Sequence, residues 1–236
     1  MKKKLTFIFS LFFIIISQAQ VVDYDFINTE NKLKYQLILD DHGNSEWKMI
    51  VNAKGDSINS YDYSKSLFKK NNEFYFLEKT LIRRVAVEDK PEFVWKIINN
   101  EKISILGYQC LTATTKFRGR NYKAYFAKNI LVNSGPWKFI GLDGIILKIE
   151  SDDGLYKFEA TNILIEDKKF NNKNLDDFLR ENTFLTWKEF EDFYINDTKD
   201  FIKQQKCNCS DDGKNILKIT KIEKVYPELQ ESGIVY

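Results

Sequence analysis

Hydrophobic and polar residues alternate along most of the chain up to about residue 166. Apolar residues occupy every second position over 33–39 and again over 47–51, and the turn-forming residues Asp41–Asn44 lie between the two runs. A period of two is typical of strands with one buried face, so these runs predict a β-hairpin. Further strands are predicted at 73–80, 81–87, 93–98, 102–105, 107–116, 122–127, 145–150 and 155–166.

Short strands that follow one another so closely are typical of an antiparallel meander. Turn residues at Arg118–Asn121 and Ser151–Gly154 predict two more tight hairpins, whereas the polar segment 52–72 reads as a long loop. We therefore expect a curved, mostly antiparallel sheet or a partly open barrel.

The pattern changes to a helical one after residue 170. A short helix is predicted from Asn174 to Arg180, and aromatic residues recur at helical spacing over about 187–205. Thr186 is the predicted N-cap of that second helix, with Glu189 as its capping-box partner. The aromatic face is expected to pack on the sheet, and residues 216–225 are read as a closing strand. The fold class predicted is α+β, dominated by β-structure, with one long helix in the C-terminal half.

One stretch, residues 134–150, is unusually rich in glycine and proline. Gly135, Pro136, Gly141 and Gly144 fall within ten residues, directly before the apolar run 145–149. Glycine and proline are used where the backbone needs a special φ or a close approach. The stretch predicts a shaped loop that leads into a buried strand.

The N-terminus has the features of a secretory signal peptide. Lys2–Lys4 precede an apolar run over 5–16 and the small residues of 17–19. That run is about 12 residues long, against roughly 20 for a membrane-spanning helix. We expect residues 1–19 to be removed, leaving a single β-rich domain at 20–236 with no transmembrane anchor, in the periplasm or secreted.

Charge argues against a nucleic-acid partner. Residues 1–19 contain three lysines and no acid, so the 36 basic residues of the chain fall to 33, against 34 acidic ones. A nearly neutral chain with interspersed signs offers no field that would follow a phosphate backbone.

Cysteines leave three alternatives open. Cys110, Cys207 and Cys209 are an odd number for an exported chain. Cys110 and one of the other two could form a disulfide, or all three could remain thiols. Alternatively, the three thiolates could hold a soft ion such as Cu(I). The only histidine, His42, lies in a predicted turn, where a solvated side chain is the ordinary outcome.

Two arginines and one loop supply the candidate binding residues. Arg118 and Arg120 suit contact with an anion, although a solvated turn is the alternative. Trp137 and Phe139 would form an apolar lip or cover one end of the sheet. The full candidate set is Arg118, Arg120, Trp137, Phe139, Gly141, Leu142, Asp143 and Gly144.

Three linked motifs, at 107–110, 119–126 and 135–147, resemble the GLPGLI family (Porph_ging) of exported bacterial proteins of unknown function. Asp143 stands where that family has proline, and Ile145 replaces its leucine, which changes the turn type expected. The resemblance implies export and association with the cell envelope, and it supplies no catalytic residue.

The sequence predicts a non-catalytic exported module, with a binding or structural role, that docks a ligand or partner at the 135–144 loop. An envelope protein, a peptide or a hydrophobic ligand would suit such a loop, and no cofactor is expected. Copper handling through Cys207 and Cys209 with Cys110 is the alternative, and an uncharacterised hydrolase using carboxylates is the third.

Overall fold

Twelve strands of the described chain form one sheet, and two helices flank its last strand in sequence. The structure is a computed structural model that describes residues 19–59, 61–166, 170–208, 217–218, 222–224 and 234–235. The strands of the sheet are β1 (Ala19–Asn28), β2 (Lys32–Leu39), β3 (Ser45–Val51), β4 (Ser66–Lys70), β5 (Glu73–Lys79), β6 (Arg84–Asp89), β7 (Lys96–Ile105), β8 (Tyr108–Phe117), β9 (Arg120–Ala127), β10 (Ile145–Ser151), β11 (Tyr156–Glu166) and β12 (Phe184–Thr186). The remaining elements are η1 (Tyr63–Lys65), α1 (Asn172–Glu181), α2 (Trp187–Asn208), β13 (Leu217–Lys218) and β14 (Ile234–Val235).

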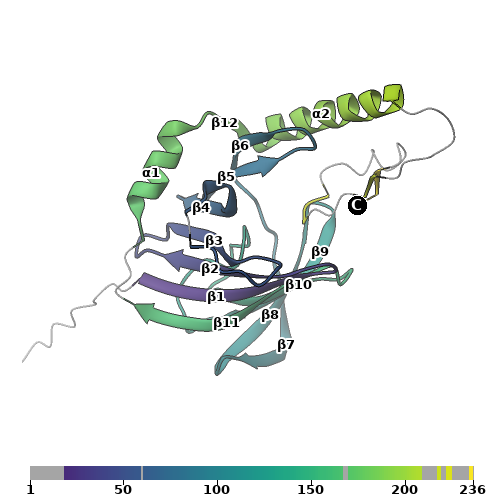
Figure 1. Ribbon diagram of the computed structural model, residues 1–236. Coiled ribbons are helices and arrows are strands. Elements are labelled where there is room, and N and C mark those ends of the chain that lie inside the picture. Colours follow the sequence, from purple (N-terminus) through teal and green to yellow (C-terminus); the bar gives the residue numbers. More distant parts are fainter. Residues whose placement is uncertain are drawn as a thin grey trace, which may run out of the picture.

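The sheet consists of two meanders, β1–β6 and β7–β11, which are joined where β1 pairs with β11. Strands β1 to β6 pair in sequence order, as do β7 to β11, and β1 lies against β11. All these pairs are antiparallel, while the short β12 runs parallel to β6 at one edge. Because the described ends β12 and β7 do not pair, the predicted curved and open sheet is confirmed (Figure 1).

Chain length explains why this sheet is curled. In a flat sheet β6 and β7 would be roughly 48 Å apart, since neighbouring strands are spaced by about 4.8 Å. Residues 90–95 alone connect them, and a fully extended connection of that length reaches only about 25 Å. The two halves of the sheet must therefore bend toward each other.

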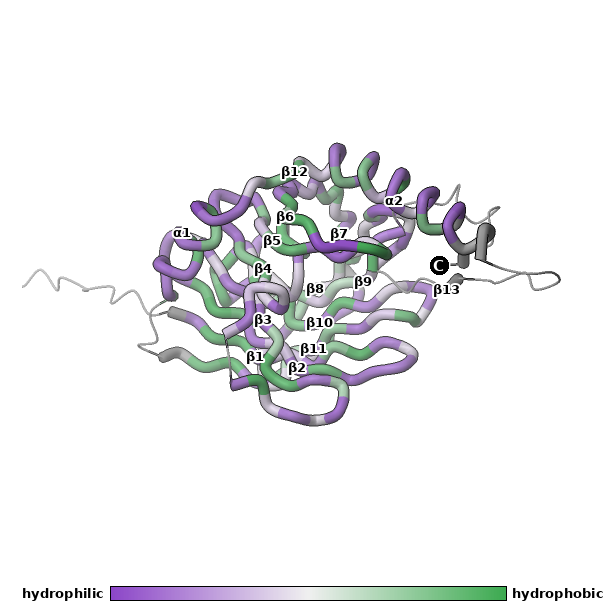
Figure 2. Tube along the Cα trace, turned by 45° about the horizontal axis from the view of Figure 1, so that its top comes forward, coloured by the Kyte–Doolittle hydropathy of each residue, from purple (hydrophilic) through white to green (hydrophobic). Residues whose placement is uncertain are grey.

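The helices cover the outer end of the first meander. Phe178 of α1 packs on Phe68 of β4, and Phe190 and Tyr194 of α2 are fully buried. The helix α2 begins as predicted, because the Thr186 backbone N–H donates to Glu189 Oε2 at 2.8 Å. Figure 2 shows hydrophobic positions along the strands and mainly hydrophilic ones along α2.

The structure corrects four details of the predicted elements. Strand β1 was not expected, and the predicted loop 52–72 contains both η1 and β4. The two strands predicted at 93–98 and 102–105 are one strand, β7, with a register shift between Ile98 and Lys102. Helix α1 begins at Asn172, two residues before the predicted start at Asn174.

Two predictions concern segments that are described only in part. Residues 1–18 of the expected signal peptide lie outside the described residues, as do five of the ten residues of the expected closing strand at 216–225. Within that segment, Leu217–Lys218 pair with Ile234–Val235 instead of joining the large sheet. None of the helices in the described part of the chain is long and apolar enough to cross a membrane.

Candidate binding site

The segment between β9 and β10, residues 128–144, fills the inside of the curled sheet; we call it the central loop. Phe139 is fully buried, and its ring packs against the rings of Tyr122 and Phe158 from β9 and β11. Gly144 has φ +145°, and an added Cβ would lie 2.3 Å from the Ala127 carbonyl oxygen, so no other residue fits there. The central loop therefore has a fixed conformation and occupies the interior of the curled sheet.

Lys138 carries a positive charge into this interior. Its side chain is 1% exposed, and Nζ lies 2.9 Å from Asp89 Oδ2 and 3.2 Å from Glu223 Oε1. Asp89 is the last residue of β6, whereas Glu223 comes from a short segment beyond α2. A buried lysine needs such partners, because an unpaired ammonium group is strongly disfavoured away from water.

Arg118, in the β8–β9 turn, contacts the same two carboxylates. Its guanidinium makes two hydrogen bonds to Asp89, at 2.6 and 2.8 Å, and another to Glu223. Burial alone would raise the pKa of Asp89, but Lys138 and Arg118 hold it below its ordinary value. Two cations and two carboxylates therefore form a closed group, which we call the charge cluster (Asp89, Arg118, Lys138 and Glu223).

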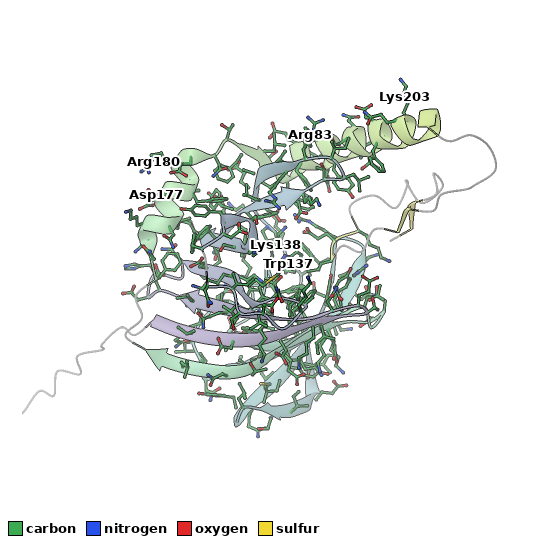
Figure 3. The ribbon with its side chains drawn as sticks, viewed as in Figure 1. Arg83, Trp137, Lys138, Asp177, Arg180 and Lys203 are labelled. Carbon is green, nitrogen blue, oxygen red and sulfur yellow. The ribbon has the colours of Figure 1, made fainter. Side chains whose placement is uncertain are left out.

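Aromatic rings surround the two cations. Lys138 Nζ lies 4.1 Å from the centre of the Phe76 ring, 4.5 Å from that of Trp187 and 5.0 Å from that of Trp137. The guanidinium carbon of Arg118 lies 3.5 Å from the Trp187 ring centre. Ring faces attract cations, so these contacts add to the carboxylate pairing. Figure 3 shows Trp137 and Lys138 between the β1–β11 layer and strands β5 and β6.

The backbone of Trp137 is strained. Its φ is +53°, in the left-handed region, which a bulky residue adopts at a cost of roughly 1–2 kcal/mol. The ring contacts both Phe117 and Phe139. Packing of the ring and of the neighbouring Lys138 offsets that strain and fixes the loop.

Of the residues predicted for binding, Arg118 and Trp137 come together at the charge cluster. Arg120 is buried elsewhere: its Nη1 is 3.5 Å from Asp153 Oδ2, its guanidinium lies 4.8 Å from the Tyr156 ring centre, and its nitrogens have no hydrogen-bond partner among the described residues. The central-loop candidates divide by exposure. Phe139, Leu142 and Gly144 are buried, whereas Gly141 and Asp143 are exposed.

The central loop is hydrogen-bonded to a second segment with an exposed residue, the β6–β7 connection. Leu131 is 90% exposed, and Val94 in the β6–β7 connection is 87% exposed. The adjacent Trp95 indole donates to the Ile140 carbonyl oxygen at 2.8 Å, which ties the connection to the loop. We call this surface the rim (Val94, Leu131, Gly141 and Asp143).

Sequence reasoning missed Lys138, Asp89 and Glu223. Asp89 and Glu223 lie 29 and 105 residues from Arg118, so no local pattern links them to it. A signal did exist for Lys138, because it stands between Trp137 and Phe139 in a loop predicted to be tightly shaped. A lysine flanked by large aromatic residues in such a loop is a candidate for burial.

The cysteines show no metal site among the described residues. Cys110 is a free, fully buried thiol that donates to the Tyr108 carbonyl oxygen, and burial raises its pKa to about 11. Cys207 lies in α2, with its side chain outside the described set, and Cys209 is outside it altogether. No group of three or more potential ligands gathers in the described part. His42 is in the expected turn, with an exposed side chain.

A separate hollow of about 150 Å³ lies beside η1. Behind it, the buried carboxylate of Glu46 accepts hydrogen bonds from the Tyr61 hydroxyl at 2.9 Å and the Ser66 hydroxyl at 3.1 Å. Lys48 and Lys65 line its mouth. Both hydroxyl groups donate to the same carboxylate oxygen, Glu46 Oε1, and so satisfy it.

No family model matches the chain, and no curated protein matches it. Among solved structures, PNGF-II in the P21 space group is 17% identical over 75% of this chain and 33% of that chain, with a TM-score of 0.50. The MucA/MucB complex of Pseudomonas aeruginosa is 7% identical over 66% and 54% of the chains, with a TM-score of 0.39. The LolA superfamily protein NE2245 from Nitrosomonas europaea is 7% identical over 67% and 90%, with a TM-score of 0.31.

These likenesses concern the fold alone. The chain spans about a third of the length of PNGF-II, so the similarity covers one part of that larger protein. The scores for the other two structures lie below the level at which a shared fold is established. Function must therefore be argued from the site itself.

Proposed function

We propose that this protein is an exported, non-catalytic binding module of the bacterial cell envelope that docks a partner protein through the rim. The observation that carries the proposal is the exposure of two aliphatic side chains, Leu131 and Val94, on two segments that the Trp95–Ile140 hydrogen bond ties together. Exposed apolar residues grouped on one surface are typical of interaction sites.

The rim is supported from within the molecule. Asn133 Oδ1 accepts a hydrogen bond from the Gly141 backbone N–H at 2.5 Å, and the Asn133 carbonyl oxygen accepts one from Lys69 Nζ at 3.1 Å. Lys138 and Phe139 anchor the same loop in the interior. A surface fixed in this way loses little conformational entropy when a partner binds, which favours affinity.

Export and envelope location are part of the proposal. The basic and apolar pattern of residues 1–19 supports them, as does the resemblance of three motifs to the GLPGLI family. The mature protein is expected to begin at Gln20, which N-terminal sequencing of protein from the periplasm or medium would check.

The two other candidate functions have no comparable observation in their favour. Copper binding through Cys110 needs a thiolate, and the raised pKa of this buried thiol opposes it. A hydrolase would need a free carboxylate near a substrate, whereas Asp89 and Glu223 are paired with cations. Binding through the rim is the function that the described geometry favours.

Site-specific photo-crosslinking in the producing cells tests this proposal. A photoreactive amino acid at position 131 should give one dominant adduct with an envelope protein, and Val94→Asp should reduce its yield at least fivefold. The matched control is position 106, because Leu106 is also an exposed aliphatic residue but lies in the β7–β8 turn. Equal labelling from positions 131 and 106 would overturn the proposal.

A further inference from the structure

The segment Ile222–Lys224 lies on the β8–β9 turn as a bound peptide would. The Lys224 backbone N–H donates to the Arg118 carbonyl oxygen at 3.1 Å, and the Tyr122 hydroxyl donates to the Ile222 carbonyl oxygen at 3.1 Å. Ile222 packs against the main hydrophobic core. Main-chain hydrogen bonds combined with one apolar side chain are a common mode of peptide recognition.

Glu223 is the acidic side chain that this segment delivers. It is buried, and its carboxylate contacts Arg118 Nη1 and Lys138 Nζ, with both carboxylate oxygens within 3.3 Å of the lysine. The second carboxylate of the charge cluster has a different origin. Asp89 belongs to β6, where its backbone is paired with Phe74 of β5.

Charge balance makes Glu223 the part of the cluster that matters for binding. Without it, the buried Lys138 and the partly buried Arg118 would share the single carboxylate of Asp89, and one positive charge would be uncompensated. The rings of Phe76, Trp137 and Trp187 attract cations but do not neutralise them. A buried charge left in that state favours uptake of another carboxylate.

We propose that Arg118 and Lys138 form a carboxylate-binding site for an acidic peptide segment of a partner protein, and that Glu223 occupies it in cis. The ligand expected is an extended segment with a glutamate after an aliphatic residue, as in Ile222–Glu223. Its backbone would take the hydrogen bonds to the Arg118 carbonyl oxygen and the Tyr122 hydroxyl. This site lies in the interior cluster and is distinct from the rim.

A peptide copied from the chain is the direct probe. The blocked peptide Thr-Lys-Ile-Glu-Lys-Val-Tyr, residues 220–226, is titrated by calorimetry into the full-length protein and its Glu223→Gln variant. The variant should bind it at least tenfold more tightly than the unchanged protein does, because its own segment no longer supplies the competing charge. A peptide with glutamine in place of glutamate should bind at least tenfold more weakly.

Three further variants keep the result interpretable. Ile222→Ala weakens the segment without disturbing the charges, and it should raise affinity for the peptide severalfold even if Glu223→Gln folds poorly. The double variant Lys138→Met with Glu223→Gln keeps one cation and one carboxylate, so it should fold and bind no peptide. Leu131→Ser, on the rim, should leave peptide binding unchanged, which separates this inference from the proposed function.

Either of two results would overturn the inference. One is equal affinity of the glutamate and glutamine peptides for the folded Glu223→Gln variant. The other is absence of binding to both the Glu223→Gln and the Ile222→Ala variants.

Discussion

Two lysines lie in the interior of the described part of the chain, each 1% exposed, and their surroundings differ sharply. Lys138 has two carboxylates and three aromatic rings around its ammonium group. Lys69 of β4 has one hydrogen bond among the described residues, to the carbonyl oxygen of Asn133. Burial lowers the pKa of Lys69 to about 8, and the negative charge of Asp40 offsets this only in part.

The difference shows what each lysine does for the central loop. Lys69 holds the loop through a single main-chain contact at Asn133, on the side of the rim. Lys138 holds it through charges that come from β6 and from the segment after α2. The first contact is one hydrogen bond from an ammonium group whose pKa burial lowers to about 8, whereas the second consists of ion pairs with two carboxylates.

Removing the positive charge of Lys138 should have the largest effect on stability. Lys138→Met leaves Asp89 and Glu223 sharing Arg118, so one buried carboxylate is uncompensated. We expect the free energy of unfolding to fall by about 3–5 kcal/mol. Urea denaturation followed by tryptophan fluorescence would measure it.

The same experiment has an internal control. Adding Glu223→Gln to Lys138→Met restores charge balance and should recover a large part of the lost stability, since the remaining pair is Arg118 with Asp89. A loss below about 1 kcal/mol for Lys138→Met would show that the buried charges do not hold the loop.

The titration of Lys69 should make the stability of the folded protein depend on pH. The folded pKa of about 8 lies below the ordinary value of 10.5, so the unfolded chain binds more protons between these values. Stability therefore rises with pH in that window as the penalty for a buried charge disappears. Relative to Lys69→Met, the unchanged protein should gain about 1.5 kcal/mol between pH 8 and pH 9.5.

Keeping the measurement below pH 10 avoids the tyrosines. Burial raises the pKa of Tyr24, Tyr35 and Tyr122, so their ionisation opposes folding only at higher pH. Parallel stability curves for the unchanged protein and Lys69→Met from pH 8 to 9.5 would mean that Lys69 titrates normally in the folded state.

The smallest expected effect concerns the ring above both cations of the cluster. Thr186 caps the helix that carries Trp187 over Arg118. Thr186→Ala should lower stability by about 1 kcal/mol, a fall in melting temperature of roughly 2–4 °C. Calorimetry measures the shift, and Thr161→Ala on β11 is the control at an exposed threonine. Equal shifts for both variants would contradict a capping role.

Local chemistry explains what could be predicted from the sequence. The Thr186–Glu189 capping box and the turns at Asp41–Asn44 and Ser151–Gly154 depend on residues within a few positions of one another, and they lie where predicted. Strand β4 was missed because Ser66–Lys69 are all buried, so no alternation of exposed and buried residues marks it. Lys69 in particular reads as a solvated residue.

Contacts between residues far apart in the sequence explain which part of the candidate site could not be predicted. Arg118 and Trp137 were recognised as binding candidates from their residue types, and they do meet. Their partners are brought together only by the curl of the sheet and by a segment beyond α2. A carboxylate such as Asp89, at the end of a strand, looks like an ordinary turn residue until the fold places Arg118 beside it.

The central claim is that Arg118 and Lys138 take up a carboxylate supplied by a separate segment. The most direct measurement is a crystal structure of the Glu223→Gln variant grown with the glutamate peptide. We expect the peptide carboxylate at about 3 Å from Lys138 Nζ and the Arg118 guanidinium, where Glu223 lies in the unchanged protein. A peptide bound elsewhere, or the substituted glutamine side chain still seated between the two cations, would contradict it.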